Sequence, residues 1–249
     1  MRGSYFGLQR GRPKLMFDVF ATACVVVAFS LPASASLITI ASSLSGPGLQ
    51  TKVIDFSQFG SANRIDGPGP ADVGGLVGEQ VLWSANNSVS LLWDGNYGFS
   101  ANGVWDSLAF AGLNGQPDNV VNSMLFDFAA GPVEGVGGFM NYVPNNPVLF
   151  PEARITALGC ENQVLETYDL IVSAPISTPN GVDAGEFRGI LRNHADICSF
   201  SIQNAAIAVT DLTFSRPDGV VPEPTTLALL GAGLLGLAAA RRRELAAVL

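Results

Sequence analysis

Residues 36–219 consist of short apolar runs, and no part of this region keeps a helical period for three turns. The runs are rich in Val, Ile, Phe, Tyr and Thr, which favour strands, and clusters of Gly, Pro, Asn and Asp between them favour turns. The predicted strands are 52–56, 80–83, 89–93, 105–110, 124–128, 136–143, 154–158, 164–172, 186–191, 197–202 and 206–214. This spacing predicts an all-β domain, a two-sheet β-sandwich or jelly roll. Residues 197–202 and 209–214 alternate apolar with polar side chains, which predicts one buried and one exposed face.

The N-terminal segment has the three parts of a secretory signal peptide. Four basic residues and no acidic one precede an apolar stretch, residues 15–31. A proline and small residues follow, in the small-x-small pattern that signal peptidase cuts. The predicted signal peptide therefore covers residues 1–35, with an uncleaved membrane anchor as the alternative. The residues that define the predicted cleavage site are Ala33, Ala35 and Ser36.

The C-terminal segment, residues 220–249, also has three parts. A rigid Pro-Glu-Pro precedes an uncharged apolar run, residues 225–240, and three arginines follow. As a helix this run would measure roughly 24 Å, short of the ~30 Å hydrocarbon core but long enough for a thinned bilayer. The arginines favour retention of their end on the cytoplasmic side. We therefore predict a single transmembrane helix over 225–240, with a buried soluble helix as the alternative.

This tripartite tail resembles the PEP-CTERM sorting signal of Gram-negative bacteria. The residues that carry the resemblance are Val221, Pro222, Glu223, Pro224, Arg241, Arg242 and Arg243. The resemblance implies that an exosortase, a membrane protease-transpeptidase, recognises and processes the tail. It also implies export, transient anchoring in the inner membrane, and delivery to the cell surface or extracellular matrix. Glycines in the tail also spell G-x-G-x-x-G, but the strand and the acidic residue that a dinucleotide site needs are missing, which excludes nucleotide binding.

The region from residue 36 to residue 223 is strongly acidic. It has 19 acidic against six basic residues, a net charge of −13. Nucleic acid is excluded as a partner, because phosphate contacts need clustered Lys and Arg. An excess of carboxylates can keep an exported protein soluble or can bind divalent cations, and we take solubility as the interpretation of this acidic charge.

Two cysteines, Cys160 and Cys198, remain once the signal peptide with Cys24 is removed. An even pair in an exported protein predicts a disulfide. Such a bond would close a loop of 39 residues and would stabilise the fold by roughly 4 kcal/mol through loop entropy. Two buried free thiols are the alternative. Two cysteines and one histidine are too few for a zinc site.

Residues 120–215 are similar in pattern to the jelly-roll, carbohydrate-binding or lectin-like domains that commonly precede PEP-CTERM tails. The similarity includes a last strand of the type aliphatic-x-Asp-Asp/Asn-Leu-x-Phe, here 209–214, with Thr210 where the first acidic residue often lies. It implies a non-catalytic module that binds exopolysaccharide or another glycan. Three tryptophans offer a sugar-stacking platform, although large apolar side chains in strands lie more often in a core. They are Trp83, Trp93 and Trp105.

The sequence contains no recognisable catalytic constellation. The single histidine, His194, lies close to Asp196, but no G-x-S-x-G elbow accompanies it, so a surface turn is the better interpretation. Asp66 and Asp94 precede glycines and are turn residues before they are calcium ligands. Several glutamates offer an acid–base pair, but their number alone proves nothing. They are Glu134, Glu152, Glu161, Glu166 and Glu186.

We therefore predict an exported protein with no catalytic residue, no cofactor and no metal. Its expected partners are signal peptidase, an exosortase and a glycan. Two other classes stay open: a purely structural surface or biofilm protein without a ligand, and a secreted glycoside hydrolase.

Overall fold

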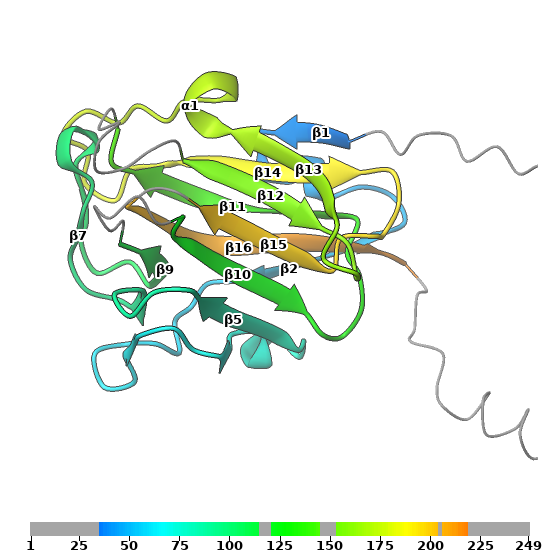
Figure 1. Ribbon diagram of the computed structural model, residues 1–249, viewed down its shortest axis with the longest axis horizontal. Helices are drawn as coiled ribbons and strands as arrows, with labels where there is room; N and C mark the ends of the chain where they lie inside the picture. Colours follow the sequence, from blue (N-terminus) through cyan, green and yellow to red (C-terminus); the bar gives the residue numbers. More distant parts are fainter. Residues whose placement is uncertain (1–34, 115–120, 145–152, 204–205, 219–249) are drawn as a thin grey trace, which may run out of the picture. The chain divides into compact units, whose positions relative to one another are not determined.

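Two large antiparallel sheets form the fold in the computed structural model, which describes residues 35–114, 121–144, 153–203 and 206–218 (Figure 1). The larger sheet has the strand order β1-β14-β11-β16-β9-β6-β3, and β2 pairs with β16. Its strands are β1 (Ala35–Ile38), β2 (Leu49–Ile54), β3 (Ile65–Asp66), β6 (Leu91–Trp93), β9 (Phe110–Leu113), β11 (Gly135–Tyr142), β14 (Glu186–Arg192) and β16 (Ile207–Pro217).

The smaller sheet has the order β13-β12-β15-β10-β5-β4. Its strands are β4 (Ala71–Asp72), β5 (Val81–Ala85), β10 (Ser123–Phe128), β12 (Arg154–Leu158), β13 (Val164–Asp169) and β15 (Ser199–Gln203). A separate ribbon and four short helical turns complete the described elements. They are β7 (Tyr97–Gly98), β8 (Val104–Trp105), η1 (Ala41–Leu44), η2 (Gly75–Val77), η3 (Ser100–Asn102) and α1 (Leu170–Ser173).

The last eight strands pass back and forth between the two sheets, except that β12 and β13 follow one another in the smaller sheet. β9, β11, β14 and β16 lie in the larger sheet, and β10, β12, β13 and β15 lie in the smaller one. The order within the larger sheet is β14-β11-β16-β9, and β13-β12-β15-β10 faces it. Two sheets of four strands linked in this way have the topology of a jelly roll. The all-β sandwich predicted from the strand pattern is confirmed.

The sheets pack through large apolar side chains on their inner faces. Along β10 every second residue is buried, which is the alternation that a strand with one face on a core produces. Phe128 of β10 packs on Phe214 of β16, with ring centroids 5.2 Å apart, and Phe126 packs on Phe56 at 6.1 Å. One apolar core therefore joins the two sheets.

A second, smaller apolar cluster covers part of the outer face of the larger sheet. Tyr97, Phe99 and Trp105, from the segment between β6 and β9, pack with Phe110 and Ala208 there. The Tyr97 hydroxyl donates to the Leu113 carbonyl at 3.0 Å, and burial raises the pKa of this hydroxyl. The side chains of this segment cover part of the outer face of the larger sheet, which would be exposed to solvent in a simple sandwich.

The prediction of one exposed face for the last two strands is wrong. β16 has only one exposed residue between Ile207 and Ser215, and four of the five residues of β15 are buried. The hydroxyl-bearing residues on these strands are small enough to lie under neighbouring segments. They are Ser199, Ser201, Thr210, Thr213 and Ser215.

Two predicted strands differ from the structure, and local backbone chemistry explains both. Within 164–172 the strand stops at Asp169, whose carboxylate accepts bonds from the amides of Ile171 and Val172 at 2.9 and 3.3 Å. That cap starts a helical turn, α1. Within 105–110 the chain turns at Ser107, which has a positive φ of 69°. The other predicted runs each overlap a strand.

The motif strand β16 contains a bulge. Its register against β11 shifts between Gly137 and Phe139, which lie opposite Thr213 and Thr210. The extra residue is Asp211, in the left-handed region with φ of 48°. Asp and Asn tolerate this conformation better than most residues, which explains an Asp or Asn at this motif position without any ligand.

The two ends of the sandwich differ in what they carry. Along the paired strands β11 and β16, Gly135 lies opposite Ser215 at one end and Tyr142 opposite Ile207 at the other. We call the first the proximal end and the second the distal end. β1 begins and β16 finishes at the proximal end, so the described chain enters and leaves the sandwich there (Figure 1).

Candidate functional site

Two long connections meet at the distal end of the sandwich. One contains β7, η3 and β8, and the other follows α1 and covers residues 174–185. A parallel bridge joins Val104 to Val182, and the Gly181 carbonyl accepts from the Val104 amide at 2.9 Å. Gly103, with φ of 89°, lies against the backbone of Gly181, where a Cβ atom has no room. The two connections therefore touch backbone to backbone.

A buried pair of asparagines ties both connections to β11. Asn102 and Asn141 are 3% and 0% exposed, and the Asn102 side-chain amide donates to the Asn141 side-chain oxygen at 3.1 Å. Asn102 also donates to the carbonyls of Tyr142 and Ile176 at 3.0 and 3.1 Å. A side-chain amide has two hydrogens, so these bonds share them. The pair links three segments that lie far apart in the sequence.

Asn141 completes the network from the other side. Its amide donates to the carbonyls of Asn102 and Ala184 at 3.1 and 3.0 Å, and to the Thr178 hydroxyl at 3.1 Å. Its side-chain oxygen accepts from the Tyr142 amide at 2.9 Å. Fully satisfied polar networks of this kind rigidify the segments that they join.

A pocket of about 260 Å³ lies between these segments. Its wall is mostly apolar, and its polar groups come from an amide and two hydroxyls. The lining residues are Ala101, Asn102, Tyr142, Pro144, Ile171, Pro175, Ile176, Ser177 and Pro179. Concave apolar sites with a few polar groups are the usual form of small-molecule sites.

A buried arginine holds the wall of the pocket from behind. Arg188, whose side chain is 4% exposed, donates to the carbonyls of Ala174 and Pro175 at 2.7 and 2.9 Å. It also pairs with Glu186 at 2.5 Å. The guanidinium is thus used by the fold and does not line the pocket.

Tyr142 lines the pocket, and its buried hydroxyl stays protonated at neutral pH. It accepts a bond from the Ile176 amide at 3.0 Å. Burial raises the pKa of Tyr142, although the bond from the Ile176 amide and the charge of Arg188 lower it, and the carboxylates of Asp169 and Glu186 raise it slightly further. Its hydrogen is therefore available to donate to an acceptor.

The tryptophans do not form a sugar-stacking platform. Trp83 lies in the main core and Trp105 in the outer cluster, each 0% exposed, as the core interpretation predicted. The Trp105 indole donates to the Ala184 carbonyl at 2.7 Å, which fixes it beside the distal connections. Trp93 is half-buried under the guanidinium of Arg64, 4.2 Å from the ring centroid.

The single histidine is an exposed turn residue. His194 lies in the bend after β14, where its carbonyl accepts from the Asp196 amide at 3.0 Å. The Asp196 carboxylate is held by Arg192 through two bonds of 2.7 and 2.9 Å, and the first of these raises the pKa of the guanidinium. The Asp196 carboxylate is therefore used in an ion pair with Arg192.

The candidate carboxylates are dispersed over the fold. Glu186 pairs with Arg188, and Glu166 lies 3.9 Å from Arg192. Among the described residues, no three His, Cys, Asp or Glu side chains gather where they could hold a metal ion. The described glutamates from the sequence prediction, Glu134, Glu161, Glu166 and Glu186, are absent from the pocket lining, and Glu152 lies outside the described residues.

The two candidate calcium-turn aspartates have partners within the fold. Asp66 pairs with Arg64 at 2.5 Å. Asp94 accepts from the Ser61 hydroxyl at 3.3 Å.

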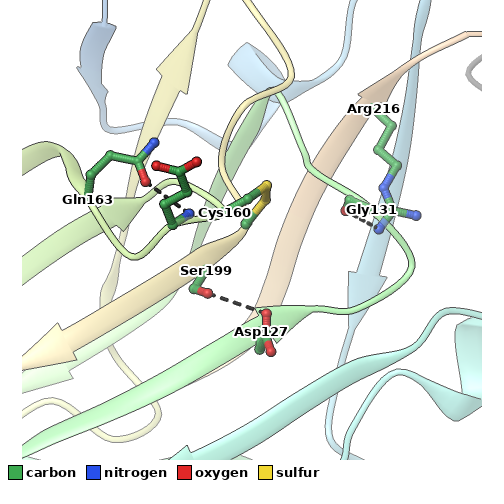
Figure 2. Close-up of a disulfide and its surroundings, with 8 residues drawn as sticks. Asp127, Gly131, Cys160, Gln163, Ser199 and Arg216 are labelled. Carbon is green, nitrogen blue, oxygen red and sulfur yellow. Dashed lines mark hydrogen bonds between the residues drawn. A yellow bond between two sulfur atoms is a disulfide. The ribbon is translucent and has the colours of Figure 1, made fainter.

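A disulfide reinforces the proximal end. Cys160 and Cys198 are bonded, with Cα atoms 4.9 Å apart, which confirms the predicted pairing (Figure 2). The bond ties the β12–β13 connection to the residue before β15. Nearby, the Ser199 hydroxyl donates to Asp127 at 3.3 Å.

The end of β16 is clamped to its neighbours. Arg216 pairs with Glu79 and donates to the Gly131 carbonyl at 3.0 Å, as Figure 2 shows for the second contact. The amide of Asp218 donates to the Gly48 carbonyl at 2.6 Å. The chain is therefore fixed up to its last described residue.

All six basic residues between residues 36 and 218 have partners inside the fold. Arg188, Arg192 and Arg216 are mostly buried, with side chains 4%, 6% and 16% exposed. The six are Lys52, Arg64, Arg154, Arg188, Arg192 and Arg216. The free charges on the described surface are therefore carboxylates.

Residues 220–243 match the family model of the PEP-CTERM protein-sorting motif. The chain carries a PEP-CTERM sorting signal. This signal supports export of the PEP-CTERM protein and its processing by an exosortase system, as the resemblance of the tail implied. No curated protein and no solved structure matches the chain.

Several predicted sites of this PEP-CTERM protein lie outside the described residues. They are Ala33, the sorting residues Val221 to Pro224, the arginines Arg241 to Arg243, and the transmembrane helix predicted over 225–240. Among the described residues, no helix is long and apolar enough to cross a membrane. Ala35 and Ser36 are the first residues of β1, paired with Arg192 and Leu191.

Sequence reasoning missed the residues that build the distal end. Asn102 and Asn141 are ordinary turn and strand residues in the sequence, and Arg188 is one arginine in a polar strand. The partners through which they join separate segments lie 13 to 76 residues away, so no local sequence pattern indicates these contacts. The one available signal was an asparagine within an otherwise apolar strand, β11.

Proposed function

We propose that this PEP-CTERM protein is an exported, non-catalytic glycan-binding protein of the cell surface or the exopolysaccharide matrix. One observation carries the proposal: the chain enters and leaves the sandwich at the proximal end, and the pocket lies at the distal end. β16 spans eleven residues between these ends, or about 35 Å of strand. A protein attached through its tail would thus hold the pocket away from the attachment point.

Processing would use the segment Val221–Pro224 as a recognition peptide. The two prolines favour an extended backbone, the form that a protease cleft binds through main-chain pairing. The fold holds the chain up to Asp218, so the motif follows the last clamped residue within a few positions. Signal peptidase would remove residues 1–35.

Substitution within the motif tests the processing step. Glu223→Ala and Pro224→Ala should each leave full-length precursor in the membrane fraction, whereas Asp218→Ala, just outside the motif, should be processed normally. Immunoblots of membrane and medium fractions give the readout. Normal accumulation of processed protein in both motif variants would show that the segment is only a linker.

A glycan array tests the binding step. The full chain, purified in detergent micelles, should bind at least one glycan class. Ala101→Trp should abolish this binding, because Ala101 is exposed at the pocket and a larger side chain there fills it. Ala129→Trp, an exposed alanine in the turn after β10, is the matched control.

A purely structural surface protein is the second candidate function. The polar groups of Asn102 and Asn141 are already bonded within the protein, and Trp83 and Trp105 are buried. Both facts reduce what the sandwich offers to a sugar. An array without binding, together with a biofilm defect on deletion, would favour this candidate.

A glycoside hydrolase receives no support from the pocket. Hydrolysis of a glycosidic bond uses two carboxyl groups that flank the bond. No carboxylate lines the pocket among the described residues. The proposal is therefore binding without cleavage.

A further inference from the structure

We infer that the distal pocket takes an uncharged sugar residue that carries a methyl group, and that it rejects acidic sugars. The inference rests on the glycan-binding function proposed above and names the class of sugar. N-acetylhexosamines and 6-deoxyhexoses share this chemistry: one sugar ring, no charge and one apolar methyl group.

The apolar wall of the pocket selects for a methyl group. Ile171, Ile176, Pro144, Pro175 and Pro179 contribute aliphatic surface, and Tyr142 is the one aromatic residue among the described residues of the lining. Removing one methyl-sized group from water is worth about fourfold in affinity. An unsubstituted hexose has no methyl group and therefore gains less from this wall.

The charges around the pocket select against an acidic sugar. The described residues of its lining include no basic side chain, and Arg188 behind the wall is occupied by two carbonyls and by Glu186. The carboxylates of Asp169 and Glu186 act on the Tyr142 hydroxyl against the opposing charge of Arg188, which is already bonded to the two carbonyls and to Glu186. An anionic ligand would therefore meet like charge and find no free cation.

Pocket size and polar groups fit a single ring. The volume of about 260 Å³ is below the roughly 300–1,000 Å³ of sites for drug-sized ligands. The exposed Ser177 hydroxyl can donate to or accept from a sugar oxygen or an acetyl carbonyl, and Tyr142 and Asn102 are the other polar residues of the lining. These groups orient a ring without requiring charge.

Equilibrium binding to four immobilised probes tests the inference. The full chain in micelles is titrated against chitin oligosaccharides, rhamnose oligosaccharides, cello-oligosaccharides and alginate oligosaccharides. We expect at least fourfold tighter binding to a methyl-bearing probe than to cello-oligosaccharides, and no binding to alginate. The first two arms distinguish an acetyl methyl from a 6-deoxy methyl. Ala101→Trp should weaken binding at least tenfold, and Ala129→Trp should leave it unchanged.

Each other outcome overturns a defined part of the reasoning. Alginate binding as tight as that of the methyl-bearing probes overturns the inference but leaves the glycan-binding function intact. Equal binding of cello-oligosaccharides overturns the methyl preference in the same way. Absence of binding to every probe overturns the inference, and the glycan array described above then decides separately whether the proposed glycan-binding function stands. If circular dichroism shows that Ala101→Trp is misfolded, Ser177→Tyr replaces it, because this residue lines the same pocket from an exposed position. Unchanged binding in a correctly folded variant would mean that the glycan does not bind in this pocket, which overturns the inference.

Discussion

Removal of the Asn141 side chain should cost the protein about 3–4 kcal/mol of unfolding free energy. The side chain is 0% exposed and joins β11 to Asn102, Thr178 and Ala184 through its amide, and to the Tyr142 amide through its oxygen. Two hydrogens and one oxygen hold about four bonds at a time, each worth roughly 1 kcal/mol net. The estimate is not higher because two of the carbonyls keep another donor.

The effect should be measured by chemical unfolding of Asn141→Ala beside Asn193→Ala. Asn193 is exposed in the bend after β14, and its truncation should change stability by less than about 0.5 kcal/mol. For a domain of this size, the loss at Asn141 corresponds to a fall of roughly 10 °C in melting temperature. Hydrogen exchange should rise at the amides of Gly103, Val104 and Gly181, which the network holds in place.

A loss below about 1 kcal/mol without faster exchange at these amides would refute the reasoning. A double-mutant cycle with Asn102→Ala makes the test stricter. Because the two side chains bond each other, the double variant should lose less than the sum of the single losses. Additive losses would mean that the asparagines act independently.

Three further predictions concern the bulge, the disulfide and the tail. Asp211→Asn should stabilise the protein at pH 7 by less than about 1 kcal/mol, because desolvation and Asp55 raise the pKa of Asp211 and so disfavour its ionised form. The gain in stability should vanish as the pH falls below the usual aspartate pKa. A stability difference that does not depend on pH would contradict this prediction. Double replacement of Cys160 and Cys198 by serine should cost roughly 4 kcal/mol in denaturant unfolding, and a non-reduced digest of the wild type should contain the linked peptides. Replacement of the arginines at 241–243 by glutamate should lower the membrane-bound fraction of the precursor, and an unchanged fraction would remove the topology argument.

The strand pattern was readable from the sequence because short apolar runs lie between clusters of turn-forming residues. β12 begins and ends at the residues predicted for it, Arg154 and Leu158. The errors arose where a side chain bonded its own backbone, as at Asp169, or where a non-glycine residue took a positive φ, as at Ser107. Both events depend on one residue and leave the hydrophobic pattern around it unchanged.

The candidate site was much less readable than the fold. Its network joins Asn102 to Asn141 across 39 residues and to Thr178 across 76. Such contacts exist only after the sheets have formed, so secondary-structure propensity and residue spacing in the sequence do not predict them. The sorting signal lies at the opposite extreme, because its order of Pro-Glu-Pro, apolar run and arginines is entirely local.

The position of β16 constrains when this protein can fold during export. β16 is the last described strand, yet it lies in the middle of the larger sheet and pairs with β11, β2 and β9. In a chain that is exported N-terminus first, β11, β2 and β9 therefore lack their shared partner strand until residues 207–217 have crossed the membrane. Only the short segment before the sorting motif remains to follow. Folding of the sandwich and arrival of the tail at the membrane are thus nearly simultaneous events, and any stop codon upstream of β16 removes the centre of the sheet rather than its edge.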